Sequence, residues 1–159
     1  MPRSAAAPTW LRRAATFAAL LCVAAGTAAA QGGLYIAGDG FSFKTAAERG
    51  IAQNPGGRRF FVLVLPGQAA ALGARATPSQ RRLRERVVAA NGVLLVCQRD
   101  LDNGRIATAG LADGVVPVRG WPGGGESAMP PGQRHHADEN PALLPESNDA
   151  LRRLRSTCS

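Results

Sequence analysis

The sequence predicts an α/β domain in which a small, mainly parallel sheet of four or five strands carries helices on both faces. Strand-like and helix-like segments alternate along the chain, as in folds whose parallel strands are joined by helical crossovers. The two best strand candidates, residues 59–65 and 92–97, are apolar throughout, which is typical of strands covered on both faces. Because each strand–helix unit spans roughly 30 residues, we expect one small, doubly wound domain.

The composition is that of a folded protein of about one domain. The chain has 159 residues, of which 45% are hydrophobic and only 5% aromatic, so the core must be mainly aliphatic. Its three cysteines are too few for a disulfide scaffold and too scattered for a zinc site. There is no collagen repeat, sustained heptad or second long apolar run, which excludes collagen, coiled coils and multi-span membrane proteins.

Residues 1–30 have the pattern of a signal peptide. An arginine-containing start is followed by the apolar stretch 14–25, which is shorter than the roughly 20 residues of a spanning helix. Ala28 and Ala30 fit the small residues of a signal-peptidase site, so cleavage is expected before Gln31. An uncleaved N-terminal anchor is the alternative.

The same segment is less well matched to two other export signals. Cys22 follows Leu21 instead of a small residue, which disfavours a lipoprotein box, and the residues after Arg12-Arg13 fit a twin-arginine signal poorly. Removal of residues 1–30 leaves 129 residues and lowers the net charge from +8 to +5. Export as a periplasmic or secreted protein, with no membrane span after cleavage, places the chain where disulfides persist.

The first half of the exported chain contains two predicted strands around one helix. Residues 33–37 form a short apolar run that ends at a Gly-Asp-Gly turn. Residues 41–53 have alanines at near-helical spacing, and residues 59–65 form the best strand before Pro66-Gly67 stops it. Residues 68–76 are rich in small side chains and stay unassigned.

The second half begins with a clear helix start. Thr77 at the N-cap and Gln80 three residues later form a capping box, with proline at the first helical position, and Asn91-Gly92 ends this helix. Residues 92–97 then form a third strand, and residues 99–111 a short helix or a pair of turns. Residues 115–118 form a fourth strand, which Pro117 places near a sheet edge.

The last part of the chain differs in character. Together with the signal peptide at 1–30, the predicted organisation is an α/β domain at 31–121, a flexible linker at 122–146 and a C-terminal helix at 147–159. In that helix one apolar face carries Leu151, Leu154 and Cys158, and three arginines flank it. Since so short a helix is marginal alone, it is expected to dock on the domain.

Cys97 is the candidate site residue. Ligands of doubly wound sheets bind beyond the carboxyl ends of the strands, and Cys97 is the thiol at such an end. Amides at the start of the following helical turn would lower the thiol pKa, and Arg99 is near enough to support a thiolate. The alternative is an inert Cys97 that acts as a small buried hydrophobic residue.

One stretch resembles the DsrE family of sulfur-relay proteins, which includes the TusD type. The match is most specific over residues 91–118 and extends over 34–121 in topology. It is carried by the Gly-Val strand that ends in Cys97, a following leucine, a Gly-Arg-Ile turn and the Leu-Ala-Asp-Gly-Val entry to the next strand. The resemblance implies that Cys97 accepts a persulfide from a sulfur donor or protein partner, and that the chain forms a homo-oligomer.

Cys158 is the candidate partner of Cys97. Docking of the C-terminal helix across the carboxyl ends of the strands would bring the two residues together in an oxidising compartment. We therefore predict a Cys97–Cys158 disulfide, in which Cys158 is a structural or resolving cysteine. The alternative is that the two cysteines are unrelated, because sequence alone does not show proximity.

Other features do not predict a site. His135-His136 lie in the linker without a cluster of further ligands, and the glycine run 123–125 does not join a strand to a helix, so neither a metal nor a cofactor is expected. The cluster of arginines at positions 81, 82, 84 and 86 fits the solvated face of a helix. It lacks interleaved aromatic residues, so no nucleic-acid partner is expected.

The sequence therefore leaves two functions open, with enzymatic activity undecided. The first is an exported sulfur carrier or thiol-redox protein that acts through Cys97. The second is a non-enzymatic periplasmic binding or structural module in which Cys97 is inert or disulfide-bonded.

Overall fold

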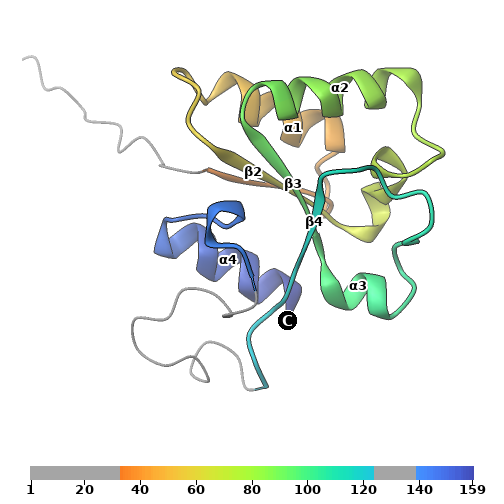
Figure 1. Cartoon of the computed structure of the whole chain (residues 1–159), viewed down its shortest axis with the longest axis vertical. Helices are drawn as coiled ribbons and strands as arrows, with labels where there is room; N and C mark the ends of the chain where they lie inside the picture. The colour runs from red at the N-terminus through yellow and green to blue at the C-terminus, as the bar shows by residue number, and fades with distance from the viewer. Residues whose placement is uncertain (1–32, 124–138) are drawn as a thin grey trace, which may run out of the picture.

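The computed structural model describes residues 33–123 and 139–159, in which strands and helices alternate (Figure 1). The elements in chain order are β1 (Leu34–Ala37), α1 (Phe43–Ala52), β2 (Phe60–Val64), the 3-10 helix η1 (Pro66–Leu72), α2 (Pro78–Ala89), β3 (Gly92–Cys97), α3 (Gln98–Asp102), β4 (Val115–Val118), the 3-10 helix η3 (Pro141–Leu143) and α4 (Asn148–Cys158).

The strands of the described residues form a four-stranded, entirely parallel sheet in the order β1-β2-β3-β4. The predicted α/β class, with its parallel sheet and helices on both faces, is confirmed. Among the described strands β4 is an edge strand, as Pro117 predicted. It pairs with β3 on one side alone in this part of the chain, and Pro117 lies opposite Val96 in that pairing.

The winding of the sheet differs in detail from the doubly wound arrangement that we expected. The strand order follows the chain without reversal, so successive crossovers of one hand place α1 and α2 on the same face. The second face is covered by α4, which comes from the C-terminal segment and not from a crossover (Figure 1). A sheet without a reversal has no switch point, the feature at which doubly wound folds open a ligand crevice.

Two separate cores, one on each face of the sheet, explain why β2 and β3 are apolar throughout. In β2, Phe60 and Val62 face the core under α1 and α2, whereas Phe61 and Leu63 face the core under α4. β3 alternates in the same way, and its Cys97 belongs to the α4 side. Because successive side chains of a strand point to opposite faces, both sets must be apolar.

The helix boundaries follow local signals. The Thr77–Gln80 capping box is present with both of its hydrogen bonds, which confirms the predicted start of α2. α2 ends where Asn91 adopts a left-handed backbone with φ 65°. Within α2, Leu83 and Val87 are buried. The arginines of the predicted solvated face are exposed or half-buried.

Three segments gain structure that the sequence did not define. The unassigned residues after β2 form η1, and the helix expected within 99–111 is the five-residue α3, which begins one residue earlier, at Gln98, and ends at Asp102. Residues 139–146, part of the predicted linker, contain η3 and bury Leu144 beneath the sheet.

Several sequence predictions lie outside the described residues. These are the signal peptide at 1–30 with its cleavage site, and His135-His136 with most of the glycine run. Within residues 33–123 and 139–159, no helix is both long and apolar enough to cross a membrane.

Candidate functional site

The carboxyl end of β3 carries a disulfide. Cys97 and Cys158 are joined by an S–S bond of 2.05 Å, with 5.0 Å between their Cα atoms. The predicted Cys97–Cys158 pairing is thus confirmed. The two cysteines are 0% and 2% exposed, so the bond lies inside the core between the sheet and α4.

Local structure explains why these two residues meet. Cys97 continues the set of β3 side chains, with Val93 and Leu95, that points toward α4. On α4, Leu151, Leu154 and Cys158 recur at helical spacing and are all buried. Burial of this apolar stripe against β3 places Cys158 above the last residue of the strand.

Arg99 contacts α4. Its Nη2 atom donates a 2.8 Å hydrogen bond to the backbone oxygen of Thr157, the residue before Cys158. Arg99 was expected to support a Cys97 thiolate. In the disulfide-bonded protein it links α3 to the last turn of α4 instead.

Asp100 is a site residue that the sequence reasoning missed. It is 1% exposed, yet no described residue donates a hydrogen bond to either carboxylate oxygen. Its Oδ1 atom lies 3.3 Å from Nη1 of Arg105 and 3.9 Å from Nε of Arg99. The sequence does contain a signal for this position: Asp100 lies in the first turn after Cys97 and has arginines on either side of it in sequence.

A second buried charge holds the end of α4 against β4. Arg155, which was expected to flank the apolar face, is itself 0% exposed. Its Nη1 atom donates to the backbone oxygen of Arg119 (2.6 Å) and to Oε1 of Glu139 (3.0 Å), and its Nη2 atom donates to Oε2 of Glu139. The Arg119 amide also donates to Glu139. These partners compensate the guanidinium at its two Nη atoms, while its buried Nε atom has no hydrogen-bond partner among the described residues. Without the Glu139 carboxylate, burial of this charge would strongly destabilise the fold.

The segment after β4 also contacts the end of α4. The Trp121 amide donates a 2.8 Å hydrogen bond to Oγ of Ser159, and the Trp121 indole donates to Ser156 at 3.2 Å. The carboxyl end of β3, where open α/β sheets commonly present their chemistry, is therefore covered by α4 and by the segment after β4.

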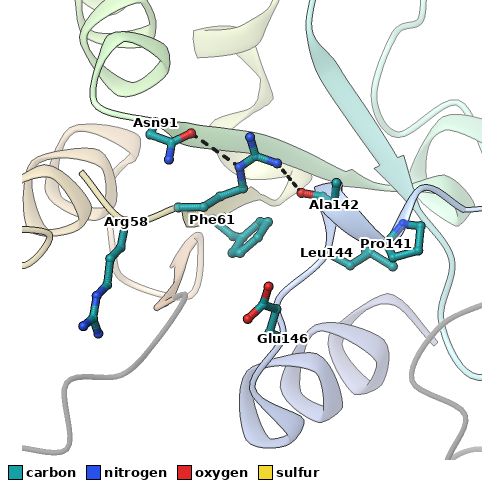
Figure 2. Close-up of a pocket in the computed structure, with 8 residues that line it drawn as sticks. Arg58, Phe61, Asn91, Pro141, Ala142, Leu144 and Glu146 are labelled. Atoms are coloured by element: carbon teal, nitrogen blue, oxygen red, sulfur yellow. Dashed lines mark hydrogen bonds between the residues drawn. The ribbon is translucent and has the colours of Figure 1, made fainter. Parts of the chain in front are cut away.

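A pocket of about 520 Å³ lies at the opposite end of the strands (Figure 2). Residues at the beginning of β2, the end of α2 and the segment around η3 form its lining. They are Arg58, Arg59, Phe61, Asn91, Pro141, Ala142, Leu144 and Glu146. A volume of this size lies within the range of small-molecule sites.

The pocket contains an arginine in a defined position. Arg59 donates from Nε to Oδ1 of Asn91 (3.4 Å) and from Nη1 to the backbone oxygen of Ala142. In Figure 2 the two dashed lines that end on the labelled Asn91 and Ala142 mark these bonds. Asn91 is held in turn, since its Nδ2 atom donates to the Gly57 oxygen at 2.9 Å. The left-handed residue that ends α2 therefore also orients the Arg59 guanidinium.

No group of three or more His, Cys, Asp or Glu side chains is placed to hold a metal ion in the described parts of the chain. Comparison with protein-family models, with curated proteins and with solved structures finds no match to this chain. The resemblance of residues 91–118 to the DsrE family therefore stays a prediction. The evidence for function comes from the geometry of the two ends of the sheet.

Proposed function

We propose that the chain is an exported, non-enzymatic binding module in which the Cys97–Cys158 disulfide is structural and the pocket around Arg59 is the ligand site. The observation that carries this proposal is the state of Cys97. Its sulfur is bonded to that of Cys158, and the residue is fully buried.

Sulfur transfer needs a different state of this cysteine. The reactive form of cysteine is the accessible thiolate, and accessibility together with a low thiol pKa distinguishes reactive cysteines from structural ones. In the described structure α4 covers Cys97, and Arg99 donates to a backbone oxygen. A structural disulfide accounts for both observations.

Export is the second part of the proposal. A buried disulfide suits an oxidising compartment outside the cytoplasm, and the predicted signal peptide supplies the route. N-terminal sequencing of the exported protein is expected to show Gln31 as its first residue. Recovery of Met1 at the N-terminus of membrane-bound protein would contradict cleavage.

Intact-mass measurement tests the role of the disulfide. The oxidised, native protein is treated with a thiol-alkylating reagent and, separately, with a persulfide donor, and neither treatment is expected to add mass. The same protein, denatured and reduced before alkylation, must gain label on both cysteines as the positive control. A sulfur adduct on native Cys97 that disappears in Cys97→Ser would contradict a structural role.

The second candidate function is the sulfur-carrier or thiol-redox role suggested by the DsrE resemblance. It is favoured by the position of Cys97, directly before α3 at the carboxyl end of β3. An external dithiol would first reduce the disulfide to two thiols and become a disulfide itself. The Cys97 thiolate would then attack the terminal sulfur of a persulfide donor, forming a persulfide on Cys97 and releasing the donor as a thiol. The Cys158 thiolate would later attack the inner sulfur of that persulfide, which re-forms the Cys97–Cys158 disulfide and releases the outer sulfur as hydrosulfide.

Mild reduction separates the two candidates. Under a dithiol concentration that opens the disulfide without unfolding the protein, the sulfur-carrier role requires a persulfide on Cys97 and its loss in Cys97→Ser. For a structural disulfide, opening the bond is expected to release α4 and to give no selective transfer to Cys97 over Cys158.

A further inference from the structure

We propose that the exposed face of α2, together with the segment that leads into it, is a docking surface for a membrane that contains anionic lipids. The surface is defined by four arginines with exposed side chains, Arg75, Arg81, Arg82 and Arg86. Contact is with the lipid headgroups, and α2 stays outside the bilayer. This inference goes beyond the proposed ligand site, since it uses neither the Arg59 pocket nor the disulfide.

Positive charge is concentrated in this part of the chain. Residues 75–86 contain five arginines and one glutamate, whereas all other described residues together contain ten basic and eight acidic side chains. The short segment thus has an excess of four positive charges, against an excess of two for the rest of the described chain. Charge of one sign gathered in one place attracts a partner of the opposite sign, most strongly at low salt.

The four surface arginines are not used inside the protein. Arg84, the fifth arginine of the segment, is half-buried and donates a 2.8 Å hydrogen bond to the backbone oxygen of Ala71. The side chains of the other four form no hydrogen bond and no ion pair with any residue in 33–123 or 139–159. Their guanidinium groups are therefore available to an external anion.

Stabilisation of α2 does not account for the arginines near its start. Acidic residues are favoured at the N-terminus of a helix, because the positive end of the helix dipole lies there, yet the first turn of α2 contains none. Glu85 follows Arg81 by four residues, which is the less favourable order for a helical ion pair, and it pairs with no described residue. A role toward an external partner accounts for these positions.

The arginines are spread over a surface and do not converge on one point. On α2, Arg82 and Arg86 are neighbours on one side of the exposed face, and Arg81 lies on the other side of Glu85. Figure 1 shows α2 at the upper margin of the molecule, with the sheet beneath it, so its outer side is open to a flat partner. A single small anion contacts one or two of these side chains, whereas a layer of headgroups contacts all of them.

The composition of this face favours a membrane over a protein partner. The centres of protein–protein interfaces are enriched in aromatic side chains. Val88 is the large hydrophobic residue that α2 exposes, and α2 contains no aromatic residue. Attraction between charges must therefore dominate binding, which makes the binding sensitive to salt.

Vesicle sedimentation of the exported protein, in its oxidised form, tests the proposal. The protein is mixed with vesicles of equal parts phosphatidylglycerol and phosphatidylcholine and, separately, with vesicles of phosphatidylcholine alone. Binding to the anionic vesicles is expected to be at least about tenfold tighter than binding to the neutral ones, and added salt should weaken it steeply. Absence of binding to the anionic vesicles, or equal binding to both kinds, overturns the proposal.

Single variants identify the surface. Arg82→Gln is expected to weaken binding to anionic vesicles about threefold to fivefold, the contribution of one basic residue near an anionic membrane. Glu85→Gln should strengthen binding by a similar factor, because it removes the negative charge among the arginines. Arg152→Gln makes the same change of charge on α4, across the sheet, and is the matched control. It should bind within about twofold of the wild type.

A combined variant, with Arg81, Arg82 and Arg86 each replaced by glutamine, tests the assignment to α2. Glutamine has a high helix propensity, so these exposed replacements should leave α2 folded, which circular dichroism checks. Binding to anionic vesicles is expected to fall at least about thirtyfold. A folded combined variant that sediments like the wild type would overturn the assignment.

Soluble polyanions separate a membrane from other partners. Polyglutamate represents an acidic protein segment and single-stranded DNA a nucleic acid, and each is titrated at the same concentration of charge as the anionic lipid. Weaker binding of both than of the vesicles supports the proposal. Tighter binding of either polyanion, lost in the combined variant, would assign the face to that class of partner and overturn the membrane proposal.

Discussion

Gly120 lies against Ser159 so closely that a Cβ atom on residue 120 would come within 2.5 Å of the Ser159 Cα atom. The main chain after β4 and the main chain at the end of α4 are therefore in direct contact. The bond from the Trp121 amide to Ser159 extends this contact by one residue. A glycine is required here by the close approach of the two backbones.

Gly120→Ala is expected to destabilise the protein by about 1–3 kcal/mol, because the added methyl group forces two backbone segments apart. Urea denaturation monitored by circular dichroism measures this change. Gly67→Ala is the matched control, since a Cβ there meets no atom within 4 Å. Equal stability of the two variants would contradict the close packing.

Replacement of both cysteines, Cys97→Ala with Cys158→Ala, is expected to lower the free energy of unfolding by about 4 kcal/mol in the chain-entropy model. The sequence separation of 61 residues is the basis of that value. Urea denaturation with and without a dithiol provides the measurement. The reductant should destabilise the wild type and leave the double variant unchanged, and an unaffected wild type would count against the prediction.

Arg105→Gln is expected to destabilise the protein by about 1–3 kcal/mol, because the buried Asp100 carboxylate loses the nearer of its two arginines. A double-mutant cycle with Asp100→Asn should recover part of the loss, since the neutral side chain needs no cation.

Lys44→Gln is the control for this cycle. The Lys44–Glu48 ion pair is exposed, so its loss should cost less than about 1 kcal/mol. A loss in Arg105→Gln no larger than in this control would show that Asp100 does not depend on Arg105.

Alkaline pH is expected to destabilise the protein through Tyr35. Burial raises the pKa of Tyr35 above its usual value of 10.0. As pH rises from 10.0 to the folded-state pKa, the unfolded chain loses the phenol proton while the folded chain keeps it, so stability falls across this window. Tyr35→Phe should remove that part of the pH dependence.

Ultraviolet absorbance of tyrosinate measures this pKa directly. Tyr35 is the one tyrosine of the chain, so titrations of native and denatured protein report on this residue alone. Coincident titration curves would contradict the effect of burial.

The elements that the sequence predicted well are those with local causes. The Thr77–Gln80 capping box involves groups three residues apart, and the apolar run of β3 needs burial on two faces whichever strands lie beside it. The disulfide was also predictable, because the spacing of Leu151 and Leu154 puts Cys158 on the face that must dock.

Other features depend on contacts between distant segments. Arg155 follows Leu154 but carries a charge, and its burial depends on Glu139 and the Arg119 carbonyl group, which lie in other segments. The winding of the sheet depends on the direction of each crossover, which side-chain patterns do not encode. The pocket combines Arg59 with Ala142, more than eighty residues away.

The two-sided sheet has a consequence for the folding protein. The core under α1 and α2 is formed by residues that precede β4, whereas the core on the other face is incomplete until α4 arrives. Before then, Phe61, Leu63 and Leu95 form an apolar surface that is open to water, and such surfaces associate between chains. Association between chains therefore competes with the docking of α4 during folding. Once the Cys97–Cys158 disulfide has formed, it holds α4 on this apolar surface and keeps the surface away from other chains.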